Sequence, residues 1–140
     1  METKSNVITV SALVNAPVEK VWKLWTTPSD IQQWNAASPD WHSPKAEHDL
    51  KPGGQFSYRM EAKDGSFGFD FGGTFDVVTE AQYLEYTLGD GRKVKVHFTE
   101  ADGGTQIDEH FEAESQNSEE MQQAGWQAIL NNFKAYAEKV

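Results

Sequence analysis

The chain has 140 residues, of which 12 are lysine or arginine and 22 are aspartate or glutamate, so its formal net charge at pH 7 is −10. A field of that sign repels the phosphates of nucleic acids and anionic lipids, and no basic cluster overrides it, so both are excluded as partners. Cysteine is absent, which excludes disulfides, a thiol nucleophile and a cysteine-ligated metal site.

The first part of the chain predicts one strand followed by two short helices. From Ile8 to Val14 apolar and polar residues alternate, as in a strand with one covered face. After Pro17, which suits the first turn of a helix, apolar residues recur every three or four positions as far as Trp25. Because proline favours a helix start and disfavours helix at the residue before it, Pro28 begins a second short helix that runs to Trp34.

The middle of the chain, from Lys45 to Ala113, predicts about six strands. Turn sequences such as Asp64-Gly65 and Asp90-Gly91 separate stretches of alternating residues. Every link has hairpin length, so we expect an antiparallel meander with one apolar face. Gly72-Gly73 interrupts the alternation between Phe67 and Val77, which predicts a bulge or sharp bend at the glycines, with Val77 on the apolar face.

The last part predicts a long amphipathic helix from Ser118 to Val140. From Trp126 onward its apolar residues fall at positions i, i+3, i+4 and i+7. Asn117 or Ser118 can cap its start. A helix of this length, about 30 Å, can cover the apolar face of the meander. The predicted fold class is therefore α+β: a curved antiparallel sheet of about seven strands gripping a long C-terminal helix, with two short helices after the first strand.

Several motifs in these elements resemble one superfamily over nearly the whole chain. They are Ala16-Pro17-Val18-Glu19-Lys20-Val21-Trp22, Trp34-Asn35, Gly53-Gly54-Gln55-Phe56, and Gly125-Trp126 with Leu130 and Phe133. The chain is similar to the START-related helix-grip proteins (SRPBCC, or Bet v allergen-like), within the branch named after the activator of the heat-shock protein 90 ATPase. The resemblance implies the same order of elements and a cavity between the sheet and the C-terminal helix. Members of the superfamily bind lipids, hormones or polyketides, or assist a chaperone.

The candidate binding residues are inward-facing aromatic side chains and one carboxylate. Glu109 shares the face of Ile107 and Phe111, and a carboxylate in an apolar interior must be paired or neutral. One interpretation is that Glu109 is a polar anchor or an acid/base group inside a pocket. The other is that a bulge or strand end exposes it to solvent, or that it pairs with a structural partner. We favour the second interpretation. His48, which faces inward by the same alternation, has the same two interpretations. The candidate ligand-binding residues are Phe56, Tyr58, Phe69, Phe71, Tyr86, Phe98, Glu109, Phe111, Trp126 and Phe133.

No catalytic or phosphate-binding motif is found in the sequence, and we assign no catalytic residue. His42 and His48 lie close to acidic residues, but their spacing fits no metal site, so we expect neither a metal nor a cofactor. The chain has no apolar run of about 18 residues, and its polar start does not resemble a secretory leader. We therefore expect a single cytoplasmic domain, residues 1–140, without a membrane partner.

Three functions follow from these observations. The leading hypothesis is a non-enzymatic module that binds a small apolar or aromatic ligand. The second is an interaction protein whose outer sheet face or loops contact a chaperone or another protein. The third is an enzyme of the polyketide-cyclase kind that uses Glu109, His48 or a tyrosine. An open cavity favours the first or third hypothesis, whereas aromatic side chains that fill the core completely favour the second.

Overall fold

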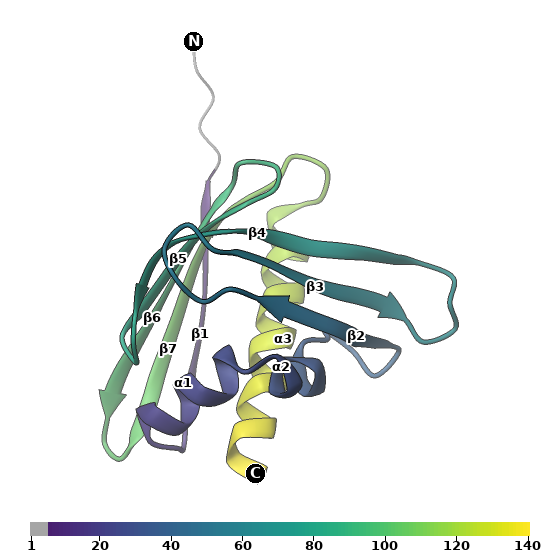
Figure 1. The fold of residues 1–140 in the computed structure, drawn as a ribbon. Helices are drawn as coiled ribbons and strands as arrows, with labels where there is room; N and C mark the ends of the chain where they lie inside the picture. Colours follow the sequence, from purple (N-terminus) through teal and green to yellow (C-terminus); the bar gives the residue numbers. More distant parts are fainter. Residues whose placement is uncertain (1–5) are drawn as a thin grey trace.

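A computed structural model of the chain describes residues 6–140, and its elements follow the expected order (Figure 1). The helices are α1 (Val18–Thr26), α2 (Pro28–Trp34) and α3 (Glu119–Lys139). The strands are β1 (Val7–Val14), β2 (Trp41–His48), β3 (Gln55–Ala62), β4 (Gly68–Thr79), β5 (Tyr83–Leu88), β6 (Lys93–Ala101) and β7 (Gly104–Glu112). The α+β class predicted from the sequence is confirmed.

All seven strands form one antiparallel sheet in the order β1-β7-β6-β5-β4-β3-β2. Strands β2 to β7 are the expected meander, and β1 joins it at the far edge by pairing with β7 from Val7↔Glu112 to Val14↔Thr105. The sheet curls into a half-barrel around α3, while α1 and α2 lie beside the C-terminal half of that helix (Figure 1). The expected grip of a curved sheet on the C-terminal helix is confirmed.

Strand β2 begins earlier than the sequence predicts. The expected strand starts at Lys45, whereas the observed one starts at Trp41 and passes through Pro44. Proline cannot donate to a strand ladder, so it is tolerated only at an edge or a bulge. β2 offers both conditions, because it is the edge strand of the sheet and its pairing with β3 shifts register between His42 and Lys45.

Strand β4 runs through Gly72-Gly73 without interruption. A Cβ atom on Gly73 would stand 2.1 Å from the Thr87 carbonyl oxygen of β5, and one on Gly72 would stand 2.6 Å from the Phe56 carbonyl oxygen of β3. No side chain fits at such distances, so these two glycines let β4 approach both of its neighbours closely. Their role is close strand packing rather than the predicted bulge.

The bulge in β4 lies further along, between Phe75 and Val77. A bulge adds one residue to the strand and so reverses which side chains face the core after it. Val77 is consequently 36% exposed, and Val78 packs against the core instead. The assignment of Val77 to the apolar face is therefore wrong.

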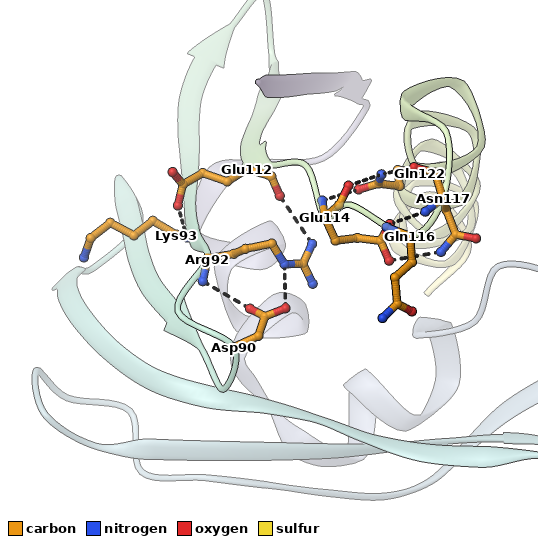
Figure 2. A network of polar contacts seen from close by, with 8 residues as sticks. All are labelled: Asp90, Arg92, Lys93, Glu112, Glu114, Gln116, Asn117 and Gln122. Atoms are coloured by element: carbon orange, nitrogen blue, oxygen red, sulfur yellow. Dashed lines mark hydrogen bonds and ion pairs between the residues drawn. The ribbon is translucent and has the colours of Figure 1, made fainter. Parts of the chain in front are cut away.

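A group of polar contacts fastens the start of α3 to the sheet (Figure 2). The Gln122 side chain accepts a hydrogen bond from the Glu114 backbone nitrogen at 2.9 Å and donates to the carbonyl oxygens of Glu114 and Asn117. The Glu114 carboxylate accepts from the Asn117 backbone nitrogen at 2.6 Å. Arg92, in the turn before β6, donates to the Glu112 carbonyl oxygen at the end of β7. These bonds hold the connection between β7 and α3 and so determine where the helix enters the half-barrel.

Candidate functional site

A cavity of about 190 Å³ lies between the concave face of the sheet and the helices. Side chains from α1, α2, α3, β2, β3, β4, β5 and β7 form its wall. The cavity exists because α3 packs closely against β1 but reaches β4 only through large side chains, as where Trp126 meets Phe71 at a ring-centroid distance of 6.0 Å. The most exposed of the wall residues in β4 is Phe69, at 43%.

Most of the predicted site residues lie in the wall of this one cavity. They are Phe56, Tyr58, Phe69, Phe71, Tyr86, Glu109 and Trp126. They come from β3, β4, β5, β7 and α3, which the meander brings together around the start of the helix. That these side chains bind a ligand stays a prediction.

The other predicted aromatic residues lie in the core, outside the wall of the cavity. Phe98 packs edge-on against Trp25, at 5.6 Å between centroids. Phe133 packs edge-on against the same tryptophan at 4.8 Å. Phe111 stacks on Trp126 at 3.9 Å, with an angle of 11° between the ring planes. These three rings pack against tryptophans that themselves line the cavity, so they form a layer of the core behind its wall.

The sequence did not indicate that α1 and α2 would take part in the site. Trp25, Ile31 and Trp34 line the cavity together with Thr26 and Asn35. Helical spacing shows that the apolar members of this set share a buried stripe, but it does not show which element the stripe meets. The Trp34-Asn35 motif could have indicated that α2 takes part, because a large aromatic residue at the end of a helix needs a packing partner.

Glu109 is the one acidic side chain in the wall. It lies in the middle of β7, in unbroken register with Val10 of β1 and Val96 of β6, and it is 5% exposed. None of the hydrogen bonds or ion pairs among the described residues involves its side chain, and burial raises the pKa of its carboxyl group to about 8. The favoured interpretation, that a bulge or strand end exposes Glu109 or that a structural partner pairs with it, is therefore wrong.

The remaining titratable groups in the wall are held in their neutral forms. His48 Nδ1 and the Tyr58 hydroxyl share a hydrogen bond of 2.8 Å, so His48 faces inward and has a partner there. Burial lowers the pKa of His48, with a small opposing effect from the Thr26 backbone, and raises the pKa of Tyr58. Burial, the nearby Glu109 and Tyr58 raise the pKa of Tyr86 well above its usual value. The site is therefore an apolar cavity that contains uncharged polar groups near neutral pH.

Comparison with known proteins identifies the family. A family model described as "Activator of Hsp90 ATPase homolog 1-like protein" matches residues 15–138. The chain belongs to this family. The branch proposed from the sequence motifs is thereby confirmed. No curated protein matches the chain.

Solved structures of relatives have the same fold. An AHSA1-like protein from Aeromonas hydrophila is 47% identical with a TM-score of 0.90, and the match covers 95% of this chain and 92% of that one. A protein from Cytophaga hutchinsonii is 51% identical with a TM-score of 0.79, covering 96% and 92%. A protein from Nitrosomonas europaea, 20% identical over 95% and 94% with a TM-score of 0.83, shares the fold alone.

This member of the AHSA1-like family also carries an aromatic cluster on its surface, formed by Trp41, Phe67 and Phe69. The centroid of Trp41 lies 5.9 Å from that of Phe67 and 6.2 Å from that of Phe69. Phe67 is 62% exposed, and Phe69 belongs to the cavity wall as well. The cluster therefore adjoins the wall of the cavity at Phe69.

Two further findings concern metals and membranes. Within residues 6–140 no group of three or more histidine, cysteine, aspartate or glutamate side chains is placed to hold a metal ion. His42, considered above as a ligand, faces Glu61 at 3.7 Å instead. None of the helices in the described part of the chain is both long and apolar enough to cross a membrane.

Proposed function

We propose that this protein binds a small aromatic or otherwise apolar molecule in the cavity between the sheet and α3. The observation that carries the proposal is about 190 Å³ of space walled mainly by aromatic and aliphatic side chains. A ligand that enters this space would remove apolar surface from water, which favours binding by about 25 cal/mol per Å² of apolar area.

The size of the cavity indicates the size of the ligand. A dry apolar cavity of about 150 Å³ in another protein is large enough to hold benzene. A cavity of about 190 Å³ is therefore suited to a molecule with one or two rings. Such a ligand would contact wall residues such as Phe56, Phe71 and Trp126.

The polar groups in the wall support binding better than catalysis. Glu109 has no hydrogen bond to His48, Tyr58 or Tyr86, so no proton relay connects it to a second acid/base group among the described residues. A polyketide-cyclase-like reaction that uses Glu109 alone stays the enzymatic alternative. A binding module requires only the shape and the apolar wall that are present.

A direct test uses naphthalene, whose own fluorescence reports binding. The native protein should give a saturable signal for a single site. Ile129→Trp places a larger side chain in the wall from α3 and should weaken binding at least tenfold. Met121→Trp is the matched control on the same helix, because Met121 is 63% exposed, and it should leave binding unchanged. The proposal fails if the native protein does not bind the probe or if Ile129→Trp binds it equally well.

A second candidate function is contact with a chaperone or another protein. It is supported by the description of the family and by the exposed cluster of Trp41, Phe67 and Phe69, since exposed aromatic patches mark interaction surfaces. If naphthalene does not bind, this function replaces the first. The cytoplasmic location expected from the sequence stays a prediction under either function.

A further inference from the structure

We infer that the cavity selects small organic cations, such as a protonated primary amine carried on an aromatic ring. The inference rests on the proposed function, because it specifies the ligand class of the same cavity. It arises from the position of one unpaired carboxyl group, Glu109, among aromatic rings. Neither the apolar wall nor the family description requires a charged ligand.

Glu109 has apolar neighbours in the sheet. In the sheet it stands between Val10 and Val96, and the same row continues to Leu84 on β5, so every strand neighbour in the row is a buried apolar residue. No lysine or arginine of the described chain lines the cavity. Residues 6–140 therefore supply neither a positive charge nor a hydrogen bond to this carboxyl group. An ammonium group in the cavity would supply both.

Several aromatic rings lie close together in the wall of the cavity. Phe56 contacts Tyr86 edge-on at 5.1 Å between centroids and Tyr58 at 5.2 Å. Phe71 lies 6.1 Å from Phe56 between centroids and meets Trp126 edge-on at 6.0 Å. The face of an aromatic ring attracts a cation placed within about 6 Å of its centre. Rings and carboxylate therefore act in the same direction, since both attract cations and both repel anions.

The other titratable groups that face the cavity determine whether the charge of an ionised Glu109 is offset. The titratable groups that face the cavity from the other elements are His48 on β2, Tyr58 on β3 and Tyr86 on β5. Burial holds all three neutral near pH 7, since it lowers the pKa of the histidine and raises the pKa of both tyrosines. No wall group among the described residues therefore offsets an ionised Glu109. The net charge of −10 further favours cations in the surrounding solvent.

The test compares three ligands of similar shape by calorimetry at pH 7: benzylamine, which is cationic, benzyl alcohol, which is neutral, and benzoate, which is anionic. Benzylamine should bind at least tenfold more tightly than benzyl alcohol, and benzoate should bind most weakly. Glu109→Gln keeps the shape and removes the charge, so it should bring the amine to within about threefold of the alcohol. The matched control Glu100→Gln removes an exposed charge from β6 and should keep the full preference.

A second measurement needs no variant. Because burial raises the pKa of Glu109 to about 8, its carboxyl group is mostly protonated in the free protein at pH 7 and would ionise when the amine binds. Benzylamine binding should therefore release a proton, which makes the measured heat depend on the ionisation enthalpy of the buffer. Benzyl alcohol should show no such dependence.

The outcomes separate the two proposals. If benzyl alcohol binds as tightly as benzylamine, if the preference survives Glu109→Gln, or if no proton is released, the cation inference is wrong and the proposed function stands. If none of the three ligands binds and naphthalene does not bind either, both are wrong. Preference for the amine, its loss in Glu109→Gln and proton release together support the inference.

Discussion

The buried carboxyl group of Glu109 makes the stability of the protein depend on pH. In the unfolded chain its pKa returns to about 4.5, whereas burial holds it at about 8 in the folded protein. Between these values the unfolded state has released a proton that the folded state retains. The free energy of unfolding therefore falls as pH rises through this window, by at most about 1.4 kcal/mol per pH unit from this one group.

We predict that Glu109→Gln removes this contribution. Glutamine keeps the shape and carries no titrating proton, so the variant should be more stable than the wild type at pH 8 by roughly 2–4 kcal/mol, with a smaller difference at pH 5. Urea unfolding at pH 5, 6.5 and 8 measures the effect. Burial lowers the pKa of His48, which gives a pH dependence of the opposite sign, but His48 is the same in both proteins and its effect cancels in the comparison.

The control for this experiment is Glu100→Gln, because Glu100 is exposed on β6. It should leave the pH dependence of the wild type unchanged. Equal slopes for the wild type and Glu109→Gln between pH 5 and 8 would show that the carboxyl group is not buried as described.

The placement of single residues was only partly predictable from the sequence. Alternation along β7 correctly assigned Glu109 and Phe111 to the inner face, because strand periodicity alone determines it. Whether Glu109 would have a partner depends on side chains from β1, β6 and the helices, which are distant in the sequence. For the same reason, alternation did not separate Phe98, which fills the core, from Phe56, which lines the cavity.

Among the elements, α3 depends on its buried face. Phe133 is fully buried and packs edge-on against Trp25 and Trp34, so one side chain joins α1, α2 and α3. Helical spacing identified this residue correctly as part of the apolar stripe. Of the two caps expected at the start of the helix, Asn117 and Ser118, the second is observed: the Ser118 hydroxyl accepts a hydrogen bond from the Met121 backbone nitrogen at 3.1 Å.

We predict that Phe133→Ala lowers the free energy of unfolding by about 3–5 kcal/mol, because it removes buried apolar area and leaves a void. Met121→Ala, on the exposed side of the same helix, should change it by less than about 0.5 kcal/mol. Chemical denaturation of the two variants measures both values. A loss below about 1 kcal/mol for Phe133→Ala would mean that another face of α3 meets the sheet.

The boundaries of elements were harder to predict than their existence. The beginning of β2 could not be predicted, because Pro44 is compatible with a strand only at an edge or a bulge. The edge position of β2 follows from the topology of the whole sheet and not from the local sequence. The bulge between Phe75 and Val77 has no glycine of its own, so the nearby Gly72-Gly73 pair drew the prediction to the wrong place. Pairing between strands, rather than local sequence, determines both features.

For the whole molecule, the charge of −10 limits the range of partners. We predict no measurable binding to duplex DNA or to vesicles that contain anionic lipids at physiological salt, because such binding requires clustered lysine and arginine side chains. Gel-shift and vesicle-sedimentation assays test this directly. Micromolar binding that weakens as salt is added would contradict the prediction.

The pairing of β1 with β7 has a consequence for the order in which the protein folds. Strands β2 to β7 form hairpins between neighbours in the sequence, and such contacts form quickly. The residues of β1, in contrast, find their partners about a hundred positions later, from Thr105 to Glu112. Closing so long a loop is entropically costly, so β1 should dock late. During synthesis, Ile8, Val10 and Val14 therefore remain uncovered until residues 105–112 have left the ribosome, and uncovered apolar residues of this kind promote aggregation.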